Sequence, residues 1–354
     1  MNLKKATARI SDALAEPRMV QLAPNLFGVC LEVMKIIPAR HILGRALQEG
    51  LIDRDTLVVE SSSGNLALGL AVVCRELGLR LHIVGDPAID GPLRNLLANL
   101  GARVDLVEQP DAQGAYQRLR LQRVQEILAT HPRAFWVRQY DNVLNAQAYA
   151  PLAAALAAEF GPRLNLVAAV GSGGSSVGLS TALRAQGCDL RLTGVDTFNS
   201  VLFGLPDGKR SLRGLGNSVM PGILDHTQFD GVHWLSGELG NRAAMQLHRA
   251  HGVFCGPTSG AAWRAARHVA ALDPDTPTAF VAADTGYRYQ GSVFAGDWAA
   301  GPDAHEPAEP RVVPHPSAVA PDDEWACMQW GRRSLAAVAG AAERDASPRP
   351  AGVA

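Results

Sequence analysis

The stretch from Leu164 to Gly178 combines residue types that could hold an anion. Leu166 to Val170 is an apolar run of the length expected of a buried strand, and glycines with interspersed serines follow it directly. A helix-like segment, Leu179 to Arg184, comes next. Glycines let backbone N–H groups turn inward, and a helix N-terminus adds partial positive charge. The pattern predicts a phosphate cradle of backbone amides and hydroxyls, formed by Gly171, Ser172, Gly173, Gly174 and Ser175.

Other phosphate motifs fit this loop poorly. It lacks the Gly-Lys-Ser/Thr ending of nucleoside-triphosphate loops. A nucleotide-binding Rossmann fold stays open, because Asp196 lies near the end of the next predicted strand, although the loop falls in the second half of the chain. A tight strand-to-helix turn without a ligand is the plainest interpretation.

A second cluster of small polar residues, Ser61 to Asn65, lies between a predicted strand, Thr56 to Glu60, and a predicted helix, Leu66 to Leu77. Such residues can cap the helix, and they can also form a nest of N–H and hydroxyl donors for a carboxylate. Both interpretations stay open here.

Lysine is scarce, which narrows any mechanism that needs an amine. The sequence has lysine only at Lys4, Lys5, Lys35 and Lys209. The first two are terminal, and Lys209 lies in a loop rich in glycine and proline. Lys35 is the interior candidate.

The composition bounds the class of protein. The chain has 354 residues, of which 47% are hydrophobic, and a formal net charge of -1, so it can form two domains with proper cores. Near-neutral charge argues against nucleic acid or an anionic membrane as the main partner. We expect no transmembrane span, signal peptide or metal site. Scattered cysteines favour reduced thiols and a cytoplasmic location; they are Cys30, Cys74, Cys188, Cys255 and Cys327.

Strands and helices alternate along most of the chain. This predicts an α/β fold with two open, mostly parallel, twisted sheets that carry helices on both faces. Residues 1–25 are expected to be a mobile lead-in with a short helix, and Asn145 to Phe160 one helix that leads into a second domain. Beyond the strands named above, we expect strands at Phe27–Glu32, Leu81–Gly85, Arg103–Glu108, Ala134–Val137, Arg191–Asp196, Val253–Cys255 and Thr278–Ala283.

Several motifs, in chain order, resemble those of the fold-type II pyridoxal-phosphate enzymes, the family of cysteine synthase, cystathionine β-synthase and the tryptophan synthase β chain. Ser62 to Asn65 is similar to the family's Thr-Ser-Gly-Asn loop, and Gly171 to Ser175 to its phosphate loop. Cys255 to Gly260 is a matching late turn, and Asp284 to Tyr289 is similar to an Asp-x-Gly-x-Arg-Tyr segment. The resemblance covers about residues 15–300. With it, we divide the chain into a large cofactor-binding domain (1–33 and 147–300), a small mobile domain (34–146) and a flexible Pro/Ala-rich tail (301–354).

The resemblance implies pyridoxal 5'-phosphate as the cofactor and gives roles to individual residues. Lys35 would hold the cofactor covalently and then act as the base at Cα. Asn65 would hydrogen-bond the ring hydroxyl, and Thr258 would face the pyridine nitrogen. The substrate carboxylate would bind to Ser62, Ser63 and Gly64. The plainer alternatives are a solvated lysine at a helix start for Lys35 and an ordinary helix cap for Thr258.

Within the family, the chain is most similar to enzymes that make a precursor of siderophore 2,3-diaminopropionate. The similarity implies β-replacement on an O-activated L-serine by way of an aminoacrylate, with O-phospho-L-serine as the preferred substrate and an amine such as L-glutamate as the nucleophile. Arg120 would bind the phosphate, because a guanidinium matches phosphate geometry, with Gln139, Tyr140 and Gly214 also at the substrate. A solvated basic helix face is the alternative for Arg120. The similarity is carried by Glu108–Tyr116, Arg120, Val124–Thr130 and Gln139–Asn142.

One departure from the family bears on catalysis. Family members place an Asn-Pro-x-Gly-Ser turn before the lysine, whereas here Leu31 to Val33 run straight into Met34 and Lys35. A displacement of ~1 Å can cost ~100-fold in rate. Two alternatives therefore stay open: a cysteine-synthase-like enzyme that uses O-acetylserine or O-phosphoserine with sulfide, and a catalytically impaired binding protein of the same fold. The resemblance also implies a homodimer.

Overall fold

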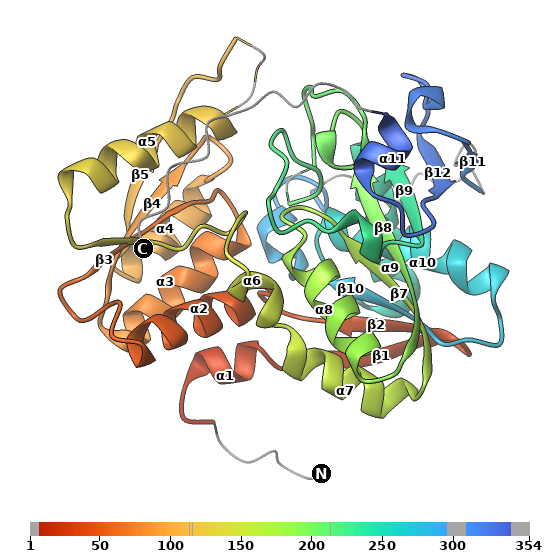
Figure 1. Ribbon diagram of the computed structural model, residues 1–354, viewed down its shortest axis with the longest axis horizontal. Coiled ribbons are helices and arrows are strands. Elements are labelled where there is room, and N and C mark those ends of the chain that lie inside the picture. The colour runs from red at the N-terminus through yellow and green to blue at the C-terminus, as the bar shows by residue number, and fades with distance from the viewer. Residues whose placement is uncertain (1–6, 113, 115, 213, 296–308, 341–354) are drawn as a thin grey trace.

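The computed structural model describes residues 7–112, 114, 116–212, 214–295 and 309–340. Their strands form two sheets, one of eight strands and one of four, in two lobes that lie side by side (Figure 1). The predicted α/β class with two mostly parallel sheets is confirmed. The division of the chain at residues 34 and 147 stays a prediction.

The smaller sheet is entirely parallel and has the order β5-β4-β3-β6. Its central strands are runs of aliphatic residues that are buried on both faces, as expected of a parallel sheet between helices. The strands are β3 (Leu57–Ser61), β4 (Arg80–Gly85), β5 (Arg103–Leu106) and β6 (Ala134–Trp136). The helices of this lobe are α2 (Ile36–Gln48), α3 (Asn65–Leu77), α4 (Gly91–Asn99) and α5 (Gln117–Thr130).

The larger sheet has the order β1-β2-β10-β7-β8-β9-β12-β11. The five strands from β2 to β9 are parallel, and β1 and β12 pair antiparallel to them. Its strands are β1 (Arg18–Ala23), β2 (Leu26–Cys30), β7 (Arg163–Ala169), β8 (Asp189–Thr197), β9 (Gly231–Leu235), β10 (Thr278–Ala282), β11 (Arg311–Val312) and β12 (Trp325–Gln329). The remaining helices are α1 (Ile10–Leu14), which contacts α2 and α3, α6 (Leu144–Gln147), α7 (Ala150–Phe160), α8 (Gly174–Ala185), α9 (Gly237–His251), α10 (Pro257–Leu272) and α11 (Leu335–Ala339).

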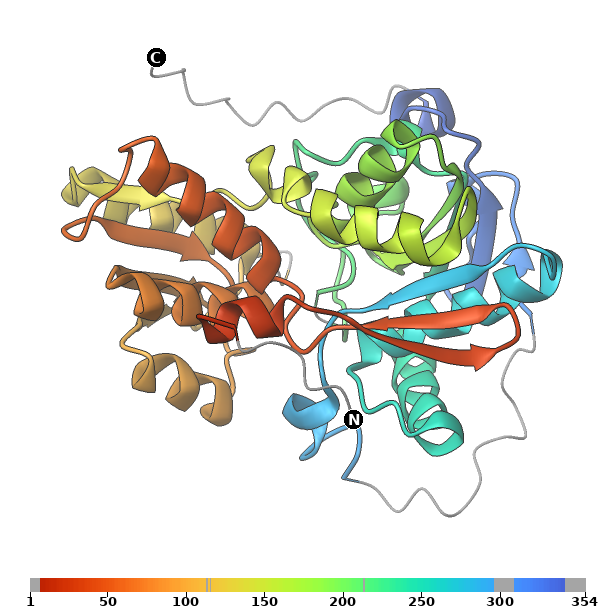
Figure 2. The ribbon, with the colours of Figure 1, turned by 90° about the horizontal axis from the view of Figure 1, so that it is seen from below.

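The chain passes between the lobes several times. From α1, which contacts the smaller lobe, it enters the larger lobe with β1 and β2, crosses to the smaller lobe at α2, and returns through α6 (Figure 2). Loops at the carboxyl ends of parallel strands are where ligands bind in open α/β sheets. The loops after β3, β6 and β7 carry the serine cluster, Gln139 with Tyr140, and the glycine-rich loop, respectively.

Three expectations about elements are wrong. Residues 18–23 are not a mobile lead-in: they form β1, which pairs with β2. The expected strand at Val253–Cys255 is a single bridge to Thr285, because α10 starts almost at once and leaves no room for a ladder. The strand that lies next to β8 in the larger sheet is instead β9, whose Trp234 is fully buried. The expected helix from Asn145 to Phe160 is two helices, α6 and α7.

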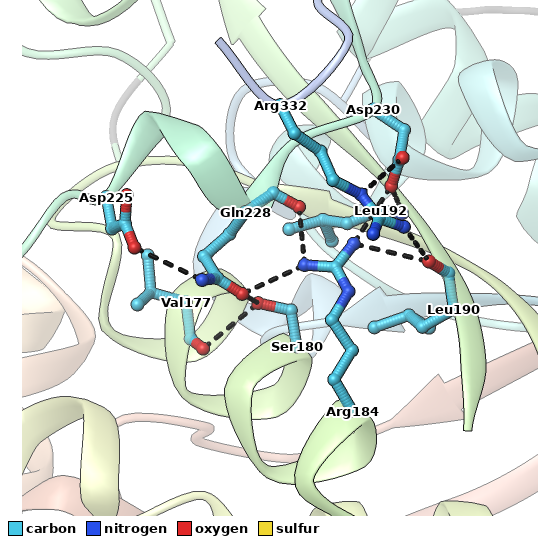
Figure 3. A network of polar contacts seen from close by, with 9 residues as sticks. All are labelled: Val177, Ser180, Arg184, Leu190, Leu192, Asp225, Gln228, Asp230 and Arg332. Atoms are coloured by element: carbon cyan, nitrogen blue, oxygen red, sulfur yellow. Dashed lines mark hydrogen bonds and ion pairs between the residues drawn. The ribbon is translucent and has the colours of Figure 1, made fainter. Parts of the chain in front are cut away.

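The expectation of a flexible tail is wrong for residues 309–340. Here β12 extends the larger sheet, and its Trp325 is buried, as is Trp330 beyond it. Figure 3 shows ion pairs that hold this segment in place. Arg332 Nε donates to Asp230 (2.8 Å), and Arg184 of α8 donates to the same carboxylate (3.0 Å). The bulky aromatic side chains supply burial that the Pro/Ala-rich composition does not. Residues 301–308 and 341–354 of the predicted tail lie outside the described residues.

Candidate active site

Lys35 lies where the two lobes meet. It directly precedes α2, and its Nζ donates to Gln139 Oε1 (3.2 Å) and Ser172 Oγ (3.5 Å). Gln139 follows β6 of the smaller sheet, whereas Ser172 follows β7 of the larger sheet. The amine is therefore within reach of both the glycine-rich loop and the end of the smaller sheet, and the solvated-lysine alternative is wrong.

The turn before Lys35 is short, and the end of β10 fixes it in place. Leu31 N donates to Ala282 O and Met34 N donates to Ala283 O, each at 2.9 Å, and Val33 forms a β-bridge with Asp284. The departure from the family pattern therefore leaves the amine directed at the glycine-rich loop.

Two ionisable groups influence each other at this place, the half-buried Lys35 and the fully buried Glu60. Burial lowers the pKa of the Lys35 amine to about 8, while the nearby Glu60 carboxylate opposes that change. Burial raises the pKa of Glu60 to about 7, against the hydrogen bonds that it accepts. Glu60 accepts from Ser61 N (2.6 Å) and Gln139 N (3.0 Å), and so orients the residue that contacts Lys35. A lysine with a lowered pKa is a better nucleophile and base near neutral pH.

Close neighbouring atoms explain why glycine, rather than a residue with a Cβ, occupies positions in the loop after β7. A Cβ on Gly171 would lie 2.9 Å from Gly214 O, and one on Gly174 would lie 2.3 Å from Asn145 Oδ1. Gly173 has a φ of +85°, a conformation that favours glycine. Gly178, further along α8, packs against α6 instead. The loop therefore presents backbone groups and the N-terminus of α8, which Ser172 Oγ and Ser175 border.

The structure argues against a dinucleotide site. Asp196 is completely buried, and its Oδ1 accepts from Thr197 N (2.8 Å). Burial raises the pKa of this carboxyl to about 7. A side chain in this position cannot reach the ribose of a bound nucleotide.

The two central serines of the cluster make different contacts, and carboxylate binding by the cluster stays a prediction. Ser62 Oγ accepts from Ala67 N (3.2 Å), which is helix capping. Ser63 Oγ instead accepts from Arg120 Nη1 (2.7 Å), and Asp86 Oδ2 lies 3.2 Å from the same guanidinium nitrogen. Gly64 connects this pair to Asn65, the first residue of α3. A cation is thus placed beside the loop that is predicted to bind a carboxylate.

Arg120 does not belong to a solvated basic face. It is 8% exposed, whereas Arg123 on the same helix is exposed and pairs with Asp105. Tyr140 is half-buried and hydrogen-bonds Arg120; burial raises the pKa of its phenol. The inward direction of Arg120 makes it available to the site.

Thr258 is the last of the candidate cofactor-binding residues. It is the second residue of α10 and is buried, while Gly256 is the N-cap, so the capping interpretation is wrong. A Cβ on Gly214 would lie 4.0 Å from Thr258 Oγ1, which places Thr258 beside the glycine loop. Asn65 Nδ2 donates to Asp284 Oδ2 (3.2 Å).

Sequence reasoning missed Glu60, Asp86 and Asn145. Glu60 had a signal, since it is a carboxylate at the end of an apolar strand, directly before the serine cluster. Asn145 had none: its Nδ2 donates to Gln139 O (2.7 Å) and Ser172 Oγ (3.4 Å), contacts between segments far apart in the chain. Within the described residues, no group of three or more His, Cys, Asp or Glu side chains could hold a metal ion.

Comparison with known proteins places the chain among pyridoxal-phosphate enzymes. A family model described as "Pyridoxal-phosphate dependent enzyme" matches residues 33–284. N-(2-amino-2-carboxyethyl)-L-glutamate synthase of Ralstonia nicotianae is 35% identical over 309 residues, covering 82% of this chain and 90% of that protein. The protein of the same name from Cupriavidus metallidurans is 36% identical over 269 residues, covering 74% and 79%.

Solved structures share the fold. O-acetylserine-dependent cystathionine β-synthase from Helicobacter pylori has a TM-score of 0.74 and 24% identity, covering 82% of this chain and 99% of that one. An O-ureido-L-serine synthase variant with bound O-ureido-L-serine has a TM-score of 0.76 and 21% identity, covering 85% and 97%.

Proposed function

The chain belongs to the pyridoxal-phosphate-dependent enzyme family, and from this premise we propose that it replaces the β-substituent of an O-activated L-serine with an amine. The preferred substrate is O-phospho-L-serine and the nucleophile is an amino acid such as L-glutamate, so that the product is a 2,3-diaminopropionate precursor. The names of the two relatives support this reaction.

The residues present fit pyridoxal 5'-phosphate. A single interior lysine directs its amine at a loop from which bulky side chains are excluded, and that loop opens α8. Lys35 would hold the cofactor, the loop from Gly171 to Ser175 would bind its phosphate, and Asn65 and Thr258 would border its ring. When bound, the cofactor withdraws electrons from the substrate's Cα.

The protein's own residues then have distinct tasks. Lys35, with its lowered pKa, would take the proton from Cα. Ser62, Ser63 and Gly64 would hold the substrate carboxylate, and Gln139 would keep the amine in place. The loops from both lobes would exclude water from the reacting atoms.

One observation carries the choice of leaving group: Arg120 is held, buried, 2.7 Å from Ser63 Oγ. Phosphate leaves as a dianion, and a guanidinium with Tyr140 beside it can stabilise that charge by paired hydrogen bonds. Acetate, the leaving group of O-acetylserine, carries a single charge and two oxygens, so phosphate gains more from a buried guanidinium at this place.

Steady-state assays test the proposal. O-phosphoserine and O-acetylserine are each supplied with L-glutamate or with sulfide, and products are identified by mass spectrometry. We expect turnover with phosphoserine and glutamate. Turnover with acetylserine and sulfide alone would identify a cysteine-synthase-like enzyme, and cofactor binding without any turnover would identify an impaired member.

A cytoplasmic location and a homodimer belong to the same proposal. All five cysteines are free, which fits a reducing compartment. No helix among the described residues is long and apolar enough to cross a bilayer. Analytical ultracentrifugation of the cofactor-loaded protein tests the dimer.

A further inference from the structure

The segment directly after β10, residues 283–286, is joined by backbone contacts to the turns on both sides of it. On one side are the contacts with Val33 and Met34 that fix the turn before Lys35. On the other side Cys255 forms a bridge with Thr285, next to the start of α10. This short segment therefore links the turn of the lysine to the turn of Thr258.

The side chain of Asp284 extends the link to a third element. Its Oδ2 accepts from Asn65 Nδ2 (3.2 Å) and from the Tyr289 hydroxyl (3.0 Å), and its Oδ1 accepts from Gly256 N (3.3 Å). The residue is only 7% exposed. Asn65 opens α3 of the smaller lobe, and Gly256 is the N-cap of α10 in the larger lobe. One carboxylate thus holds together the two turns that carry Asn65 and Thr258.

Asp284 also decides which end of the Asn65 amide faces the site. An ionised carboxylate only accepts hydrogen bonds, so the NH₂ group of Asn65 must face it. The second N–H of that NH₂ group then points away from Asp284 and can donate to a ring oxygen. A side chain able to rotate freely would present its carbonyl oxygen part of the time.

We infer that Asp284 is a positioning residue, which orients the Asn65 amide and fixes the Thr258 turn so that both can hold the cofactor ring. The identity of that ring rests on the proposed function.

The residues around Asp284 favour its hydrogen bonds to Asn65 and Gly256. Burial raises the pKa of its carboxyl, and the hydrogen bonds from Asn65 and Tyr289 with the charge of Arg288 oppose that rise. A Cβ on Gly256 would lie 2.5 Å from Asp284 Oδ1 and 2.5 Å from the Tyr289 ring. A glycine is therefore required for the backbone N–H to reach the carboxylate.

The test compares cofactor binding in a double-mutant cycle. Full-length protein is freed of cofactor and titrated with pyridoxal phosphate, and the absorbance of the lysine-bound cofactor is recorded. Asp284→Asn should raise the cofactor Kd by about 10-fold and shift the absorbance band, since the hydrogen bonds to a charged carboxylate are weakened. Asn65→Ala should give a similar rise, and the Kd of the double variant should rise by clearly less than the product of the two single effects, because part of the effect of Asp284 passes through Asn65 and the rest through the Thr258 turn.

A matched control is available in the same chain. Asp273 Oδ2 accepts from Asn165 Nδ2 (3.1 Å), an Asp–Asn pair outside the site. Asp273→Asn should leave the cofactor Kd unchanged. A Kd for Asp284→Asn within about twofold of the wild-type value, or additive effects in the double variant, would overturn the inference.

Two further arms keep the test decisive. If Asp284→Asn does not fold, Tyr289→Phe removes one donor from the same carboxylate. It should raise the Kd by about threefold in the wild-type background and by less in the Asn65→Ala background. An unchanged Kd, or an equal rise in both backgrounds, overturns the inference. Wild-type protein that binds cofactor but converts no phosphoserine would contradict only the proposed reaction. Wild-type protein that takes up no cofactor would contradict both.

Discussion

The glycine loop after β7 contacts Lys35 directly, and the serine loop after β3 is linked to it through Gln139, but the two loops are built in opposite ways. The glycine loop works through its backbone, and neighbours such as Asn145 and the Gly214 carbonyl leave no room for a Cβ. The serine loop works through side chains, with Ser63, Arg120 and Asp86 in one buried contact set. In the proposed function, the glycine loop would hold the cofactor phosphate and the serine loop the substrate carboxylate, both of which stay the same, while Arg120 beside the serine loop would meet the leaving group, which differs between substrates.

This difference predicts two distinct effects of substitutions, one on cofactor binding and one on the choice of substrate. A change in the glycine loop should weaken cofactor binding whatever the substrate. A change at Arg120, beside the serine loop, should alter the choice of substrate while the cofactor stays bound. The predictions below test that separation, beginning with the amine of Lys35.

Lys35→Ala should have the largest effect, because it removes both the covalent attachment and the base. We expect kcat/KM for phosphoserine with glutamate to fall by at least about 1,000-fold. Borohydride reduction and peptide mass mapping should find the cofactor adduct on the Lys35 peptide of the wild-type protein. Lys209→Ala, at an exposed position, is the control and should retain activity. Equal activity of the two variants would remove the basis of the mechanism.

Arg120→Lys should keep the charge beside Asp86 but lose the guanidinium fork. We expect kcat/KM with phosphoserine to fall by about 10- to 100-fold, because charged hydrogen bonds of roughly 1.5–3 kcal/mol are lost, while any activity with acetylserine changes little. Arg123→Lys, exposed on the same helix, is the matched control. If both substrates lose activity equally, Arg120 does not select the leaving group.

Gly174→Ala should weaken the cofactor site without changing the choice of substrate. Its Cβ would lie 2.3 Å from Asn145 Oδ1, and overpacking of this kind costs typically about 1–3 kcal/mol. We therefore expect the cofactor Kd to rise by about 10-fold. Gly44→Ala is the control, because a Cβ there meets nothing within 4 Å. An altered ratio of phosphoserine to acetylserine activity would contradict the separation of the two loops.

Glu60→Gln should change how stability depends on pH. The pKa of Glu60 is raised from 4.5 to about 7, so between these values the folded protein binds more protons than the unfolded chain. Glu60 therefore contributes stability below about pH 4.5 that is lost as the pH rises to about 7. Urea unfolding of cofactor-free protein across this range should show a flatter pH dependence for the variant, by roughly 1 kcal/mol per unit of pKa shift. Identical pH dependences would mean that Glu60 has an ordinary pKa.

Local patterns were enough to predict most of the central strands and both loops. Leu166 to Val170 and Thr56 to Glu60 are apolar runs of strand length, and each ends in small polar residues. The docked segment with Trp325 and Trp330 was missed because its average composition resembles a tail. Its order comes from pairing with β9, a partner that is distant in the chain.

The sequence alone determined which residue types are available to this protein: one interior lysine, a glycine loop before a helix, and a serine loop after a strand. Their chemistry follows from composition and spacing, which are local properties. Only the tertiary structure decided that Arg120 points inward to Ser63, that Glu60 and Asn145 surround Gln139, and that Asp284 reaches Asn65. These contacts join residues from separate strands and helices, and their geometry depends on how the two sheets pack, which local patterns do not encode.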